Sequence, residues 1–233
     1  MRRAVALLAG LSAGVWPAFA AELDLPEGCV PYLTVQSVDC EVDIYMRCDK
    51  PSGQYIRIQN YAPHGLDTIE EATDDWSILF SVDVERKTGL VVRQGPQTPI
   101  SGAAMLSDGL TEFEYPVDFY FDRPAPYAVQ MTGIFRMTGE TVVVDGHELM
   151  VLENRIRVEI PPPLGPLETI QAGYYSADLD AYMEGSGSLR LGQNVTPIEA
   201  GPARFALPGE PGWLSLKPLF NCPAEDASWR PLP

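Results

Sequence analysis

Residues 139–160 read GETVVVDGHELMVLENRIRVEI, and this stretch decides the fold. At its centre is Asp145-Gly146, a dipeptide that favours the two-residue turn of a β-hairpin because both positions tolerate a positive φ. Valines precede the turn, and after it apolar residues at 150, 152, 156, 158 and 160 share a face opposite charged ones. A period of two is typical of a strand with one buried face. The stretch therefore predicts an antiparallel hairpin of two strands.

The same period recurs along the chain and predicts further strands at residues 40–48, 56–59, 76–85, 112–121 and 214–220. Residues 172–185, AGYYSADLDAYMEG, predict two more, joined by an acidic turn. Helix is scarce, and a turn or two is expected only at residues 64–72 and 102–110, while residues 185–188 are interpreted as a flexible joint. The predicted fold is mainly β: an antiparallel curved sheet, a half-barrel or a barrel, with little helix.

The first twenty residues have the pattern of a secretory signal peptide. Arg2 and Arg3 give a positive start, residues 4–15 are apolar and uncharged, and cleavage is expected after Ala20. The apolar run is too short to span a bilayer. We expect residues 21–233 to form a single β-rich domain, periplasmic or secreted, with no membrane span in the mature chain.

The mature chain is strongly acidic. Arg2 and Arg3 fall in the leader, which leaves 14 basic against 32 acidic side chains and a net charge of −18. Such a chain is repelled by phosphate backbones and anionic lipid, so no nucleic-acid partner is expected. The charge either marks a solvated surface or attracts a cationic partner.

The chain has four cysteines, and an even number in an exported protein predicts two disulfides. Cys40 and Cys48 would be about 26 Å apart along a strand, whereas a disulfide needs Cα atoms within about 7 Å. We favour Cys29–Cys48 with Cys40–Cys222, because residues 37–39 are the best local turn. Cys29–Cys40 with Cys48–Cys222 stays open.

Residues typical of catalysis are sparse. His64 and His147 both fall in turn-like sequence, Ser186 lacks the surroundings of a nucleophile elbow, and no phosphate loop, dinucleotide motif or zinc pattern is present. We therefore predict no catalytic, cofactor-binding or metal-ligating residue and no cofactor.

Acidic pairs are the remaining route to an enzyme. Asp74-Asp75 and Asp178 with Asp180 are the visible candidates. Two carboxyl groups across a cleft could hydrolyse a glycosidic bond, but Asp178 and Asp180 are better explained as turn residues that bond the backbone.

Aromatic side chains gather on the predicted strands. Tyr115, Phe119 and Phe121 share one face, and Trp76 and Phe80 share another. They either pack a core or line a cavity for an apolar ligand.

Two segments also carry a resemblance. Residues 139–149, GETVVVDGHEL, and residues 173–179, GYYSADL, resemble uncharacterised exported bacterial β-sheet proteins of the domain-of-unknown-function type. Those proteins have a G-x-E-x-V-x-V-x-G hairpin and then a tyrosine-rich strand that ends in Tyr-Ser-Pro, where this chain has Ala177. The resemblance implies a half-barrel similar in outline to periplasmic lipoprotein carriers, and it carries no catalytic residue.

The leading functional hypothesis is a non-enzymatic periplasmic domain that binds an apolar ligand or a lipid-bearing partner on the concave face of the sheet. One alternative is an envelope interaction or structural protein that uses its acidic face. The other is a carboxylate-based hydrolase, which requires two acids facing one cleft, one of them with a raised pKa.

Overall fold

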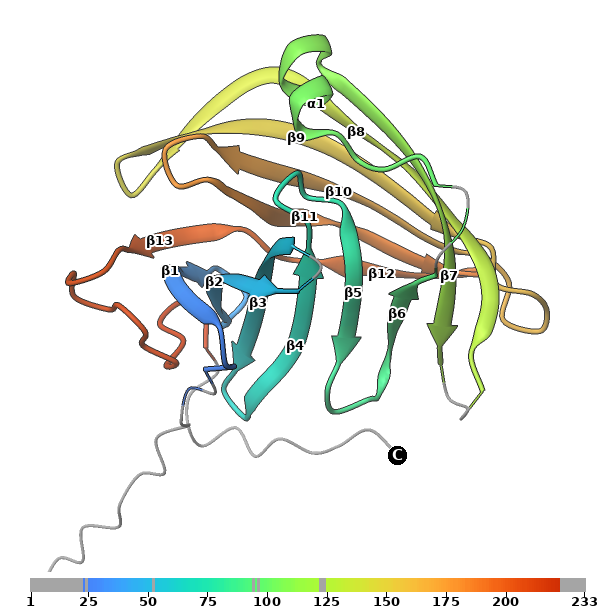
Figure 1. The fold of residues 1–233 in the computed structure, drawn as a ribbon, viewed down its shortest axis with the longest axis horizontal. Helices are drawn as coiled ribbons and strands as arrows, with labels where there is room; N and C mark the ends of the chain where they lie inside the picture. The colour runs from blue at the N-terminus through green and yellow to red at the C-terminus, as the bar shows by residue number, and fades with distance from the viewer. Residues whose placement is uncertain are drawn as a thin grey trace, which may run out of the picture.

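The computed structural model describes residue 23 and residues 25–51, 53–93, 95, 97–121 and 125–222 (Figure 1). The predicted signal peptide and its cleavage site after Ala20 lie outside these residues. Within the described part of the chain, no helix is both long and apolar enough to cross a membrane.

Among the described residues, thirteen strands form one antiparallel sheet, in which strands that follow one another in the chain are neighbours from β1 to β12, and β13 pairs with β1. The strands are β1 Cys29–Ser37, β2 Val42–Lys50, β3 Gly53–Ala62, β4 Gly65–Ala72, β5 Ile78–Asp83, β6 Thr88–Val92, β7 Leu110–Tyr120, β8 Tyr127–Val144, β9 His147–Val158, β10 Leu167–Ser176, β11 Ala181–Leu191, β12 Asn194–Ile198 and β13 Pro202–Ala206.

The connection between the sheet's two edges explains its curvature. β12 and β13 are the edge strands, yet only residues 199–201 separate them in the chain. A link of that length spans at most about 14 Å between Ile198 and Pro202, so the sheet has to bend back until its edges approach. In the described residues no ladder of hydrogen bonds joins β12 to β13, so the sheet is curved and not closed. This confirms the mainly β, antiparallel curved sheet predicted from the sequence.

The hairpin that the sequence predicts most strongly is present. β8 and β9 are joined by Asp145 and Gly146, with φ of 48° and 87°, the positive pair that this turn requires. The two strands arch across the molecule in Figure 1. The turn also contacts β13, because the amide of Phe205 on β13 donates a hydrogen bond to Asp145 Oδ2 at 2.9 Å.

One half of the sheet is filled by a core of large side chains. Phe113, Tyr115 and Phe119 on β7 are buried with Phe135 on β8. Helix α1, Gly102–Asp108, is capped by Ser101 and packs Met105 into the same core. The aromatic face predicted on residues 112–121 is therefore packed core.

Strand β2 is covered on both faces. Its outer face, with Val42, Ile44 and Met46, packs against a C-terminal segment, residues 207–222, through Leu214 and Leu216. Its inner face, which we define as the face of β2 that carries Tyr45, packs toward β11.

The C-terminal segment is not the strand predicted at residues 214–220. Its amides bond side chains of β1 instead of a neighbouring ladder: Leu214 N donates to Thr34 Oγ1 and Leu219 N donates to Gln36 Oε1, both at 3.0 Å. Because these acceptors satisfy the amides individually, the segment lies on the sheet without joining it.

Two disulfides join Cys29 to Cys48 and Cys40 to Cys222, which confirms the favoured pairing. The first links Cys29 on β1 to Cys48 on β2, which lie directly opposite each other in the sheet. The second anchors the C-terminal segment to the turn between β1 and β2, where Cys40 has a φ of 66°. Cys40 is thus a turn residue rather than the first residue of the predicted strand. Two disulfides indicate an oxidising compartment.

Other local predictions were wrong. Residues 64–72 form a turn and β4 rather than helix, and residues 185–188 continue β11 rather than form a joint. Trp76 and Phe80 do not share a face: a register shift at Glu71/Ala72 leaves Trp76 in the core, while Phe80 lines an outer groove.

Candidate functional site

The inner face of β2 carries a carboxylate. Alternate residues of a strand point to opposite sides, and Val42 and Ile44 are fully buried on the outer face. Asp43 and Tyr45 therefore point to the inner face. Glu41 and Asp39 come just before them, at the entry to the strand.

The register of the next strands extends this polar surface. Asn60 on β3 lies directly opposite Asp43. Further along, Glu70 on β4 lies opposite Ser81 on β5, and the Ser81 hydroxyl donates to Glu70 Oε1 at 2.9 Å.

Glu184 reaches the same region from β11. The negative charge of Glu70 is the largest electrostatic influence on its pKa, and Asp39 adds to it. Gln171 on β10, which is buried, donates a side-chain hydrogen bond to it. Only the curvature of the sheet brings a residue of β11 near β2 and β4. We call Asp39, Glu41, Asp43, Glu70 and Glu184 the inner carboxylate cluster.

Asn60 bridges two members of the cluster. Its Nδ2 donates to Glu41 Oε2 and to Asp43 Oδ1, each at 2.8 Å. This amide fixes the two carboxylates side by side, an arrangement that costs free energy when both are ionised.

The surroundings raise the pKa of both carboxyl groups that Asn60 bridges. Crowding by protein atoms, with the nearby charge of Asp39, raises the pKa of Glu41 to about 7. The same loss of hydration, with the charges of Glu41 and Glu70, raises the pKa of Asp43 to about 8. In both cases the Asn60 hydrogen bond opposes the rise.

Glu70 and Glu184 are shifted in the same direction. Loss of hydration raises the pKa of Glu70, against the Ser81 hydrogen bond. Loss of hydration and then the charge of Glu70 raise the pKa of Glu184. Glu184 is solvent-exposed and the other four members are half-buried, so solvent reaches carboxylates that protein atoms crowd from several sides.

The cluster holds hydrogen-bond acceptors without matching donors. Asp39 Oδ1 and Asn60 Oδ1 are buried atoms that bond no other group in the described part of the chain. Among the ion pairs of the described residues, none joins a lysine or arginine to any of the five carboxylates. A ligand that fits would bring donors and positive charge.

Aromatic residues join the two sides of the site. The Tyr45 hydroxyl donates to the backbone oxygen of Tyr182 at 2.9 Å, and burial raises the pKa of both phenols well above 10. The Tyr182 ring stacks on Phe135 and lies against Trp76, and its hydroxyl bonds the amide of the buried Asn154. Hydroxyls in this state donate hydrogen bonds and do not ionise near neutral pH.

One member of each acidic pair singled out in the sequence makes a contact outside the cluster. Asp180 lies in the turn before β11, as predicted, and its carboxylate pairs with the Arg47 side chain at 2.6 Å. Asp75 Oδ1 accepts from the amide of Ala103 at the start of α1. The structure does not bring either pair into the inner carboxylate cluster.

The two histidines lie in different surroundings. His147 packs edge-on against the ring of Phe205. His64 meets Asp67 and Glu85.

Sequence reasoning missed the inner carboxylate cluster. The strand predicted at residues 40–48 places Glu41 and Asp43 on a face opposite Val42 and Ile44, and a polar face usually points to bulk solvent. One signal in the sequence was available: the strand has a continuous apolar face opposite Asp43. A second segment of the chain has to cover that apolar face.

A separate groove lies on the outer face of β4–β7. Its volume is about 510 Å³. Its wall is mostly apolar and includes Ile69, Phe80, Val82, Val91 and Tyr120.

Comparison with known proteins finds no matching protein-family model, no matching curated protein and no matching solved structure.

Proposed function

We propose that the chain is a periplasmic binding protein whose inner carboxylate cluster holds the ammonium or guanidinium group of a cationic ligand. The observation that carries this proposal is the set of five crowded carboxylates that no lysine or arginine of the described residues pairs with, beside two buried acceptor oxygens without a donor, Asp39 Oδ1 and Asn60 Oδ1. The net charge of the mature chain adds long-range attraction for such a ligand. The signal-peptide pattern and the two disulfides support the periplasm as its location.

Calorimetric titration with spermidine tests the proposal. We expect the variant Asp43→Asn/Glu184→Gln to bind about tenfold more weakly than the wild type, since it removes two charges of the cluster. The matched control is Glu112→Gln/Glu148→Gln, which removes two exposed charges outside the cluster and should bind as the wild type does. Equal weakening in both variants would show that only net charge matters and would overturn the proposal.

The same samples separate binding from catalysis. Paired carboxylates with raised pKa values are also what a carboxylate-based hydrolase uses. The probe is a glucosamine oligosaccharide, which carries ammonium groups and also glycosidic bonds that paired carboxylates could hydrolyse. A binding protein returns it unchanged after prolonged incubation, and mass spectrometry of the recovered ligand checks this. Consumption of a ligand by the wild type but not by Asp43→Asn/Glu184→Gln would favour the hydrolase.

The outer groove favours a second candidate function, binding of an apolar ligand such as a fatty acyl chain. Its volume of about 510 Å³ falls within the range of small-molecule sites, about 300–1,000 Å³. Native mass spectrometry of protein purified from its own envelope should show a bound lipid, which Val82→Asp should abolish. Lipid retained in full by Val82→Asp would argue against the groove.

A further inference from the structure

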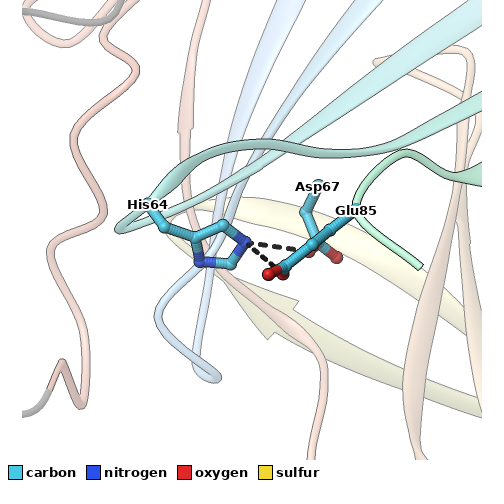
Figure 2. Close-up of side chains that lie close together, drawn as sticks. All are labelled: His64, Asp67 and Glu85. Atoms are coloured by element: carbon cyan, nitrogen blue, oxygen red, sulfur yellow. Dashed lines mark hydrogen bonds and ion pairs between the residues drawn. The ribbon is translucent and has the colours of Figure 1, made fainter. Parts of the chain in front are cut away.

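Three side chains with metal-binding atoms meet at one end of the sheet (Figure 2). His64 Nε2 lies 3.2 Å from Asp67 Oδ1 and 3.6 Å from Glu85 Oε2. All three ligand-type atoms lie within 4.8 Å of one another. Figure 2 shows the imidazole nitrogen pointing between the two carboxylates.

Two neighbouring hairpins supply these residues. His64 is in the two-residue turn between β3 and β4, Asp67 follows in β4, and Glu85 is in the turn between β5 and β6. The amide of Val84 donates to the backbone oxygen of Asp67 at 2.7 Å, which fixes the second turn against β4. The backbone therefore sets the spacing of the three side chains.

The spacing suits a metal ion. Bonds of about 2.1 Å to nitrogen and oxygen, at angles between octahedral and tetrahedral values, place neighbouring ligand atoms about 3.0–3.4 Å apart. The observed separations of 3.2 and 3.6 Å are close to this range. Small side-chain rotations bring all three atoms onto one ion.

The donor set indicates the class of ion. An imidazole nitrogen suits zinc, copper, iron and nickel, whereas calcium and magnesium prefer oxygen alone. Two carboxylates offset the charge of a divalent cation. His64 and Glu85 are about half exposed, at 47% and 52%, so water can complete the coordination.

We propose that His64, Asp67 and Glu85 form a binding site for a divalent transition-metal ion of the zinc class. The site is separate from the inner carboxylate cluster, and neither proposal depends on the other.

Calorimetric titration of the chelator-treated protein with Zn²⁺ tests the site. His64→Gln and Glu85→Gln should each weaken Zn²⁺ binding by about tenfold or more, because each removes one of three ligands. The matched controls are His147→Gln, which alters the only other histidine of the chain, and Glu148→Gln, which removes an exposed carboxylate beside it. Both controls should bind as the wild type does.

Two further measurements test whether Zn²⁺ binds at His64 rather than at the inner carboxylate cluster. Nitrogen-15 spectra of the imidazoles should show that Zn²⁺ shifts Nε2 of His64 and leaves His147 unchanged. Asp43→Asn/Glu184→Gln should keep the wild-type Zn²⁺ affinity. The proposal fails if His64→Gln binds Zn²⁺ as well as the wild type, or if the ion is lost from Asp43→Asn/Glu184→Gln, since it would then lie at the inner carboxylate cluster.

Discussion

Asp43 and Asn60 face each other across β2 and β3, and the Asn60 amide nitrogen donates to Asp43 Oδ1 at 2.8 Å. The same nitrogen donates to Glu41. This single amide therefore limits how far the pKa values of two crowded carboxyl groups rise.

Asn60→Ala should raise the pKa of Asp43 and of Glu41 further, because the hydrogen bonds that favour their charged forms are lost. Carboxyl-detected NMR titration measures both values. Gln171→Ala is the counterpart, since it removes the bond to Glu184 and should raise the pKa of that carboxyl group without raising those of Asp43 and Glu41. Unchanged titration of Asp43 in Asn60→Ala would contradict the assigned role of the amide.

The stability of the protein should fall as the pH rises between about 4 and 8. In this window the native state keeps protons on Asp43 and Glu41, whose pKa values are about 8 and about 7, while the unfolded chain has released them. The native state binds more protons, so the free energy of unfolding decreases with pH. Urea unfolding at several pH values measures this slope.

Asp43→Asn should flatten that slope and raise stability near pH 8, because it removes a charge that the fold does not hydrate well. Glu140→Gln, at an exposed position of β8, is the control and should leave the slope unchanged. A wild-type slope that persists in Asp43→Asn would place the titrating group elsewhere.

Tyr45→Phe should destabilise the fold by about 1–3 kcal/mol, because the backbone oxygen of Tyr182 loses its buried donor. Tyr55→Phe is the matched control: this tyrosine is also buried, but its hydroxyl lies 3.9 Å from Cys29 Sγ and bonds the partly exposed Lys50 side chain, so its loss leaves no buried backbone oxygen without a donor. Urea unfolding should separate the two variants. Equal stability would mean that the Tyr45 bond does not link the two sides of the site.

Removing the Cys40–Cys222 disulfide should cost more than removing Cys29–Cys48. The two bonds span sequence separations of 182 and 19 residues, and loop-closure entropy gives about 5 against about 3 kcal/mol. In Cys40→Ser/Cys222→Ser, the rate of amide hydrogen exchange should also rise at Leu214 and Leu219. These two amides belong to the C-terminal segment and bond side chains of β1. Exchange unchanged there would show that the segment needs no anchor.

The sequence was enough to predict the strands but not which of their faces points inward. Asp145-Gly146 and the period of two depend on local geometry, so the hairpin and the curved sheet were predictable. The apolar face of β2 is the outer face, because the C-terminal segment covers it there through Leu214 and Leu216. The Cys40–Cys222 disulfide and side-chain acceptors of β1 hold that contact. Such interactions produce no periodic pattern in the amino-acid sequence.

The carboxylate and metal-type clusters could not be predicted for a related reason. Glu184 reaches Glu70 only because the sheet bends between β4 and β11, and Glu85 reaches His64 only through the register of two hairpins. Both depend on tertiary distances. Composition left attraction of a cationic partner open as an alternative to a solvated surface, and it did not indicate where such a partner would bind.

The most direct test of the inner carboxylate cluster is the spermidine affinity measured against pH. Because a cation needs the ionised carboxylates, binding has to displace protons held by groups with pKa values of about 7 and 8. The account predicts that affinity rises about tenfold or more between about pH 6 and pH 8.5. It also predicts that protons are released in calorimetry with two buffers, and that both effects become smaller in Asp43→Asn/Glu184→Gln, which keeps Glu41 as a titrating member of the cluster. An affinity independent of pH in the wild type, or a pH dependence of undiminished size in that variant, would contradict it.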